Sequence, residues 1–213
     1  MQTAAEGSRA MAEAPILRDA DGKGILAAIG RMSSTRGNYL VGQSADFLVA
    51  IALLAAAWRY DVEHPLRAAL IVLLGLFVFS FIEYAFHRWL FHGRVALFER
   101  GHTLHHERPL GYDSLPFFFA PMVALSCAGA LMLLLPAAVA LLFMGAVALG
   151  YALYGFSHYI IHRRRFRSAL WRQWAAVHNI HHFHPDKNYG VTTPLWDFIL
   201  GTWYVSKSKV GRR

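Results

Sequence analysis

The longest uncharged segment of the chain restricts its fold more than any other feature. No Asp, Glu, Lys or Arg occurs between Ser114 and Ser157, a run of 44 residues. Roughly 20 apolar residues of helix cross a bilayer core, so the run is long enough for two spans, with the expected turn at Pro136. A soluble helical core accounts poorly for such a run. The segment therefore predicts an integral membrane protein.

Two other apolar segments predict further spans. An uncharged run from Ala68 to Ile82 continues apolar to Phe86, which makes a third span. The stretch from Val41 to Trp58 is a fourth and weaker candidate, because it contains Asp46. We therefore expect an all-α integral membrane protein with four transmembrane helices.

The first 40 residues contain no uninterrupted apolar core, so they carry no signal-peptide pattern. We expect residues 1–40 to form a cytosolic N-terminal arm and residues 41–213 to form one membrane-embedded domain. Cys127 is the single cysteine of the chain, so no intrachain disulfide can form.

The basic residues are distributed unevenly between the two predicted sides of the membrane. If the N-terminus lies inside, the segments 1–40, 87–113 and 158–213 are also inside and hold 19 of the 21 Lys and Arg. This bias is the positive-inside pattern of membrane proteins. The net charge of +8 is therefore expected to orient the protein and to bind anionic lipid heads, not nucleic acid.

Histidines gather on the same predicted side. Eleven of the twelve follow the inner ends of the second and fourth spans, and His64 is the exception. We expect them to form a cytosolic-side helical cap. The clusters are HRWLFH (His87, His92), HTLHH (His102, His105, His106), HYIIH (His158, His162) and HNIHHFH (His178, His181, His182, His184).

The spacing within the clusters is suited to metal binding. Residues i and i+4 share one face of an α-helix and can bind the same ion. The middle histidine of each HxxHH triplet, His105 or His181, lies about 100° around the helix and points toward a second ion. The sequence thus predicts two metals, each bound by histidines of both triplets. The i, i+4 pairs are His102 with His106, His158 with His162, and His178 with His182.

Four histidines need separate treatment. His87 and His92 are five residues apart and share a face poorly on a regular helix, so they can bind one ion only if the helix ends or unwinds near Gly93. Isolated histidines are more often surface or core residues than ligands, and His64 and His184 are interpreted in that way.

Other functions of membrane histidines fit the pattern less well. Bis-histidine haem needs axial ligands on facing helices within the membrane, and a metal transporter needs polar ligands near mid-membrane. The spans before Glu83 and between Ser114 and Ser157 contain no histidine. A non-enzymatic membrane protein that stores or senses metal remains an alternative.

The order of the clusters, HX4H, HX2HH, HX3H and HX2HH, resembles the fatty acid hydroxylase/sterol desaturase superfamily, and most closely its fatty acid 2-hydroxylases. The resemblance covers roughly Glu83 to Trp203 and makes residues 41–213 a fatty acid hydroxylase domain. One departure is Gly155, where the family tends to have Asp. The similar stretches are EYAFHRWLFH (Glu83–His92), GHTLHHERPLGYDSLPFFFAP (Gly101–Pro121), GYALYGFSHYIIH (Gly150–His162) and HNIHHFHPDKNYGVTTPLWDFILGTW (His178–Trp203).

The resemblance implies two iron ions that activate O₂, with zinc able to occupy the sites in purified protein. Imidazole suits several transition metals, so iron is an inference from the family alone. The helical pairs and the resemblance give the same division of ligands. We expect one metal to be bound by His87, His92, His102, His106 and His181, and the other by His105, His158, His162, His178 and His182.

Outer groups usually orient ligating imidazoles through their second ring nitrogen. Glu83 precedes His87 by four residues and shares its face, so it is a candidate for this role. Pairing with Arg88 is the alternative for Glu83, and a turn after Pro185 is the alternative for Asp186 and Asn188. The remaining candidates of this kind are Tyr189 and Asp197.

The resemblance implies a lipid hydroxylase that inserts oxygen from O₂ at the 2-position of a fatty acid or sphingolipid acyl chain. Hydroxylation or desaturation of a sterol or carotenoid is the related alternative. No redox domain is expected within the 213 residues, so a separate ferredoxin or cytochrome would deliver electrons. The expected location is a bacterial inner membrane, or the endoplasmic reticulum if the chain is eukaryotic.

Overall fold

A computed structural model describes residues 25–60, 64–93 and 96–206, and every regular element in these ranges is a helix. The all-α class is confirmed for this part of the chain. The elements are α3 (Ile25–Ser33), α4 (Arg36–Ala57), the 3₁₀ turn η1 (Trp58–Tyr60), α5 (Pro65–Ala85), the π-helical turn η2 (Phe86–Phe91), α6 (Ala96–Glu107), α7 (Phe119–Met132), α8 (Ala137–Arg163), α9 (Ala169–Phe183) and α10 (Leu195–Ile199).

Three helical segments are long and apolar enough to cross a membrane: Arg36–Tyr60, Pro65–Phe91 and Ala137–Arg163, of 25, 27 and 27 residues. At 1.5 Å per residue each is about 38–40 Å long, which exceeds a hydrocarbon core of about 30 Å. Large apolar side chains are exposed along them, Leu48 by 66% and Leu73 by 60%. These surfaces suit lipid, and the chain is a membrane protein.

The fourth predicted span differs from the other three. Its helix, α7, has 14 residues, or about 21 Å, and so falls short of the bilayer core. The residues before it, from Ser114 to Phe118, are not helical, and Pro116 lies among them. Proline removes a backbone donor and disfavours helix in the residue before it, which explains the late start of α7. The turn expected at Pro136 is present, since α8 begins at Ala137.

A buried side chain of α4 binds the segment that precedes α7. Asn38 donates to the Ser114 hydroxyl at 3.0 Å and to the Leu115 carbonyl at 2.9 Å, and its own oxygen accepts the Phe117 N–H at 2.9 Å. Irregular backbone is tolerated at membrane depth where protein groups satisfy it. Asn38 provides this for the entry to α7.

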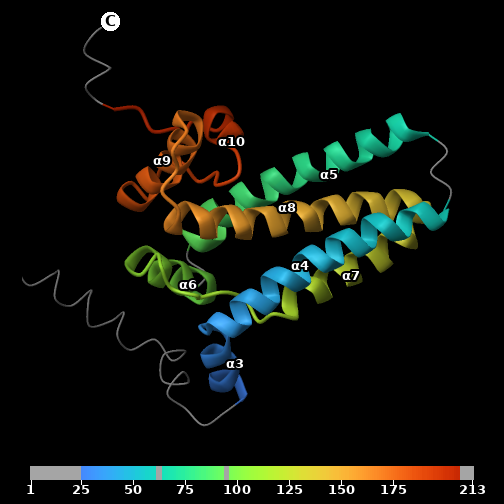
Figure 1. Ribbon diagram of the computed structural model, residues 1–213, viewed down its shortest axis with the longest axis horizontal. Coiled ribbons are helices and arrows are strands. Elements are labelled where there is room, and N and C mark those ends of the chain that lie inside the picture. The colour runs from blue at the N-terminus through green and yellow to red at the C-terminus, as the bar shows by residue number, and fades with distance from the viewer. Residues whose placement is uncertain (1–24, 61–63, 94–95, 207–213) are drawn as a thin grey trace, which may run out of the picture.

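Helix α8 forms the centre of the bundle and lies between α5 on one side and α4 with α7 on the other (Figure 1). Half of its most apolar stretch is buried inside the protein. Small side chains allow close helix approach within membranes, and most of the buried positions of α8 are small. They include Ala140, Gly145, Ala146, Ala148, Gly150 and Ala152.

The helices α6, α9 and α10 gather at the end of the bundle where α5 and α8 finish (Figure 1). We call α6 together with residues 169–205 the cap. Ile161 of α8, Ala175 of α9 and Val191 form a small buried cluster that joins the cap to the bundle. The histidine segment that follows α5 and the one at the end of α8 therefore lie at the same end of the bundle, as the predicted topology required.

The expected N-terminal arm lies mostly outside the described residues, which begin at Ile25. Residues 25–40 form α3 and the first turn of α4. Thr35 caps α4, since its side chain accepts the Asn38 N–H. Helix α4 then runs without a break across the expected boundary at residue 40, and it includes Asp46.

Candidate metal centre

Ten histidines converge where the cap meets the ends of α5 and α8, and they form two groups of five. Within each group one nitrogen from every histidine lies within 4.8 Å of the others. The membership equals the five-and-five division expected from the helical spacing. The first histidine group is His87, His92, His102, His106 and His181; the second histidine group is His105, His158, His162, His178 and His182.

In the first histidine group the Nε2 atoms point at a common position. His102 Nε2 lies 3.0 Å from that of His87 and 2.9 Å from those of His92 and His106. His181 Nε2 lies 3.0 Å from that of His92. Ligands at right angles around a metal, with bonds of about 2.1 Å, are about 3.0 Å apart. The spacing therefore fits five imidazoles around one ion.

The second histidine group has the same spacing. His178 Nε2 is 3.1 Å from that of His162 and 3.2 Å from that of His182. The Nε2 atoms of His105 and His158 are buried and have no hydrogen-bond partner among the described residues. Orphaned buried nitrogens are rare and costly, whereas a bound cation would satisfy both. This donor set also fits a transition metal.

Helical periodicity explains most of the arrangement. The pairs His102 with His106, His158 with His162, and His178 with His182 lie within α6, α8 and α9 at a spacing of four. The middle residues of the two triplets change partners, so that His105 of α6 joins the second histidine group and His181 of α9 joins the first. This exchange interlocks α6 with α9.

A π-helical turn explains how His87 and His92, which a regular α-helix would point in different directions, reach the same group. The turn η2 spans Phe86–Phe91, and the His92 N–H donates to the His87 carbonyl at 3.2 Å. An i→i+5 bond is the mark of a π-helix, a form often found at functional sites. The α-helix unwinds at this point, as the five-residue spacing required, and both imidazoles reach the first histidine group.

Burial keeps the histidines of both groups neutral. Burial, together with the neighbouring imidazoles, lowers the pKa of His92 to about 4 and those of His181 and His182 to about 3. The pKa of His105 falls to about 2 for the same reasons. Only a neutral imidazole can offer its lone pair to a metal, so the groups are ready to bind at neutral pH.

Backbone carbonyls bind the second ring nitrogen of two histidines in the first group. His87 Nδ1 lies 2.5 Å from the Tyr189 carbonyl and His181 Nδ1 lies 2.7 Å from the Lys187 carbonyl. A carbonyl only accepts, so each Nδ1 carries the hydrogen and each Nε2 keeps its lone pair. Both acceptors belong to one loop after α9.

The carboxylates expected near the histidines bind this loop and not the imidazoles. Glu83 accepts the N–H groups of Val191 at 2.6 Å and of Thr192 at 2.9 Å, and also the Thr192 hydroxyl. Asp197 accepts the Tyr189 N–H at 2.8 Å and the Gly190 N–H at 2.9 Å. Both side chains are buried. Glu83 is therefore linked to His87 through this loop, whose Tyr189 carbonyl binds the His87 ring, and not by the direct contact that their shared helix face predicted.

The three other predicted outer residues have different positions. The ring of Tyr189 lies 5.5–5.6 Å from those of His87, His92 and His181, so it packs against the first histidine group. Asn188 is buried and donates to the Val177 carbonyl at 3.1 Å. Asp186 is 74% exposed and pairs with Lys187 at 3.7 Å.

A relay that the sequence did not indicate supports Asp197 from α5. The Thr202 hydroxyl donates to Asp197 at 2.7 Å and lies 2.9 Å from the Tyr84 hydroxyl, which in turn accepts from Arg88 at 2.8 Å. Arg88 thus donates to the Tyr84 phenol, whereas Glu83 binds the loop after α9. No spacing rule links Tyr84 to Thr202, 118 residues away, and only the fold reveals the pair.

The two histidines interpreted as surface or core residues lie outside both groups. His64 is exposed and precedes α5. His184 is exposed, and its ring stacks on that of Tyr204 at 4.4 Å.

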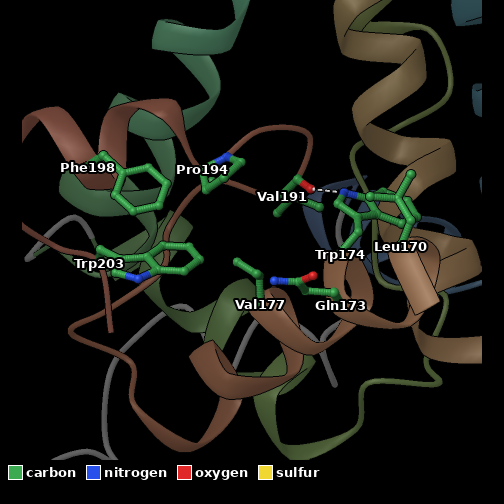
Figure 2. Close-up of a pocket in the computed structure, with 9 residues that line it drawn as sticks. Leu170, Gln173, Trp174, Val177, Val191, Pro194, Phe198 and Trp203 are labelled. Atoms are coloured by element: carbon green, nitrogen blue, oxygen red, sulfur yellow. Dashed lines mark hydrogen bonds between the residues drawn. The ribbon is translucent and has the colours of Figure 1, made fainter. Parts of the chain in front are cut away.

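An apolar pocket of about 410 Å³ lies in the cap, lined by residues of α9, of α10 and of the segments before and after α10. In Figure 2, Phe198, Pro194 and Trp203 face Val191, Trp174 and Leu170 across the hollow. Val177 lies at its lower edge and directly precedes His178. The Trp174 indole donates to the Val191 carbonyl at 2.9 Å, which fixes one wall. The lining is Leu170, Gln173, Trp174, Val177, Gly190, Val191, Pro194, Phe198 and Trp203.

Comparison with known proteins gives relatives of one kind. The chain is 31% identical over 150 residues to a dihydroceramide fatty acyl 2-hydroxylase of Arabidopsis thaliana, which covers 65% of this chain and 62% of the relative. It is 34% identical over 144 residues to a fatty acid 2-hydroxylase of Macaca fascicularis, covering 61% of this chain and 38% of the relative. The matches thus span less than two thirds of these relatives.

A solved structure shares the fold. Full-length Scs7p, in which only the hydroxylase domain is visible, superposes with a TM-score of 0.69 at 24% identity and covers 82% of this chain and 69% of that one. The family model described as fatty acid hydroxylase matches residues 72–202, more than half of the chain and all ten clustered histidines. The chain belongs to the fatty acid hydroxylase family.

Proposed function

We propose that the protein is a lipid hydroxylase that inserts oxygen at the 2-position of a long acyl chain, in a free fatty acid or a sphingolipid. The observation that carries the proposal is the pair of five-histidine groups at the end of a membrane-spanning bundle. The family and the 2-hydroxylase relatives support the same reaction.

The two histidine groups would each hold one metal ion, and iron is the metal proposed. Bound iron would supply the activation of O₂. Zinc suits the same imidazoles and would replace iron in protein purified without it. The neutral state of the imidazoles, which burial enforces, favours loading of either metal.

The overall reaction needs electrons from outside the chain. One C–H bond of the methylene beside the carbonyl becomes C–OH, and the second oxygen atom of O₂ leaves as water with two protons and two electrons. A separate ferredoxin or cytochrome is therefore the proposed donor.

The position of the two histidine groups at the end of the bundle determines which carbon of the acyl chain lies close enough to react. The histidines lie where α5 and α8 finish, at one end of the long apolar helices. A lipid with its tail in the bilayer has its polar head at this level, so the carbons nearest the carbonyl come closest to the histidines. The apolar pocket lined by Val177, the residue before His178, is the proposed place for part of the acyl chain.

The proposed topology has four crossings, with both termini and the cap on the cytosolic side. Residues 114–118 extend at most about 17 Å and α7 about 21 Å, which together suffice for the fourth crossing. A bacterial inner membrane is the proposed location. Thiol labelling of Asp186→Cys and Leu134→Cys in Cys127→Ala protein tests the sidedness, since the first should react only from the cytosol and the second only from outside.

Lipid analysis of cells tests the proposed activity. Cells that express the chain should accumulate 2-hydroxy acyl lipids, whereas cells that express His178→Ala should not. Asp186→Asn is the matched control, because this carboxylate is exposed in the same cap, and it should behave as wild type. A new hydroxyl or double bond in a sterol or carotenoid would favour the ring-lipid alternative. Unchanged lipids despite bound metal would favour the metal-storing alternative.

A further inference from the structure

The two histidine groups differ in how their imidazoles are oriented, and one loop makes the difference. Residues 187–192, which we call the clamp loop, provide the carbonyls of Lys187 and Tyr189 to His181 and His87. Acceptors on the second ring nitrogen fix both the tautomer and the orientation of a ligating imidazole. Two ligands of the first histidine group are thus prepositioned by a single segment.

Two buried carboxylates from different elements bind residues 189–192 of the clamp loop. Asp197 of α10 binds the N–H groups of Tyr189 and Gly190, and Glu83 of α5 binds those of Val191 and Thr192. Four successive backbone donors are therefore bound by two carboxylates. Glu83 belongs to α5 and Asp197 to α10, so these bonds attach the loop both to the bundle and to the rest of the cap.

The backbone of the clamp loop also has a conformation that few residues permit. Asn188 has a φ of 54°, in the left-handed region that asparagine tolerates better than most residues. A Cβ on Gly190 would lie 2.0 Å from the Thr193 carbonyl oxygen and 3.0 Å from Asp197. The loop can approach Asp197 only because residue 190 is glycine.

The second histidine group lacks such support. Among the described residues, no backbone carbonyl binds a ring nitrogen of this group, and the short contacts of its Nε2 atoms are to other histidines of the group. The Nδ1 atom of His178 is buried and has no partner. Its imidazoles must therefore be ordered by packing alone, which leaves their orientation less defined than that of His87 and His181.

We infer that Glu83 and Asp197 are positioning residues that, through the clamp loop, make the first histidine group the tighter of two unequal metal sites. The inference rests on the proposed function, since it requires both groups to bind metal. Loss of outer partners costs about 10- to 100-fold in metal affinity at other sites. The first site should exceed the second by a factor of this order.

Competition with a chelator measures the two affinities separately. The full-length protein is stripped of metal in detergent and equilibrated with Zn²⁺ and increasing chelator, and bound zinc per chain is counted by mass spectrometry. Wild type should lose its two ions in two steps, separated by about 10- to 100-fold in chelator. His92→Ala should shift the tight step and His162→Ala the weak one, which assigns the steps to the groups.

Variants of the two carboxylates test their role. In Asp197→Asn either orientation of the amide places its NH₂ against a backbone N–H, because Oδ1 accepts from Tyr189 and Oδ2 from Gly190. The tight step should weaken by about 10- to 100-fold while the weak step stays in place. Asp186→Asn, an exposed carboxylate next to the same loop, should change neither step.

Glu83 provides a graded second test. In Glu83→Gln the amide oxygen can replace Oε1, which accepts both backbone N–H groups, and the NH₂ can donate to the Thr192 hydroxyl. Glu83→Ala should therefore weaken the tight step, and Glu83→Gln should restore most of it. If Asp197→Asn gives no folded protein, Thr192→Val, which removes one hydroxyl from the clamp, should produce a smaller shift of the same step.

The outcomes distinguish this inference from the proposed function. Two ions lost in a single step, or a carboxylate variant that shifts both steps equally or only the weak one, would overturn the inference and leave the hydroxylase proposal intact. Protein that binds fewer than two ions under saturating zinc would contradict the two-metal centre itself.

Discussion

His87 and His92 are joined across one π-helical turn, in which the His92 N–H donates to the His87 carbonyl at 3.2 Å. On a regular α-helix a spacing of five would separate the two side chains by about 140°. The wider turn instead brings both Nε2 atoms to within 3.0 Å of that of His102. A single local change of helix type thus completes the first histidine group.

Gly93→Ala should disrupt this turn. A Cβ at residue 93 would lie 1.9 Å from the Trp89 carbonyl oxygen, so the backbone must shift. We expect the unfolding free energy to fall by about 1–3 kcal/mol and the zinc content to fall from two ions toward one, measured by thermal unfolding and mass spectrometry. Gly129→Ala is the control, since nothing lies within 4 Å of its Cβ. Two tightly bound ions in Gly93→Ala protein would contradict the role assigned to the turn.

Loss of single histidines should separate ligands from bystanders. His178→Ala or His182→Ala should lower the metal content and reduce hydroxylation to below about 1% of wild type, since even outer-shell changes cost up to about 100-fold. His64→Ala should change neither quantity, because His64 is exposed at the start of α5. Full activity with one ion per chain would defeat the assignment of ten ligands.

Much of this site could be predicted from the sequence because helical periodicity is a local property. The spacing of four in His102 with His106 places both on one face without knowledge of the fold, and the run of uncharged residues predicted α7 and α8 as elements. The contacts of Glu83 could not be predicted, because Val191 and Thr192 lie more than 100 residues away. The bonds from Asn38 to the non-helical segment before α7 were likewise not predictable, because Asn38 lies 77 to 79 residues before the groups it binds.

The stability of the metal-free protein should depend on acid in a defined direction. Burial lowers the pKa of His92 to about 4 and that of His181 to about 3 in the folded state, whereas in the unfolded chain they titrate near 6.5. The unfolded state therefore binds more protons below pH 6.5, and stability falls as the pH falls. Thermal unfolding should show a midpoint that declines from about pH 6.5 toward pH 4. A midpoint that rises over this range would contradict the neutral state of the groups.

A substitution in the apolar pocket should weaken substrate binding without changing metal binding. Val177 lines it and Ala176, its exposed neighbour on α9, does not. Val177→Trp should fill the hollow and raise the KM for a long acyl chain, while both ions are retained. Ala176→Trp adds the same bulk outside the pocket and should leave KM unchanged. Equal kinetics for the two variants would exclude the pocket from the acyl-chain path.

Labelled oxygen provides the most direct measurement of the central claim. Iron-loaded protein is incubated with a reductant, a long-chain fatty acid or ceramide, and ¹⁸O₂, and the product is analysed by mass spectrometry. We predict one ¹⁸O atom, located on the carbon next to the carbonyl, in wild-type protein and none in His178→Ala. Label at mid-chain or on a ring, or a double bond without inserted oxygen, would contradict the assignment as an acyl 2-hydroxylase.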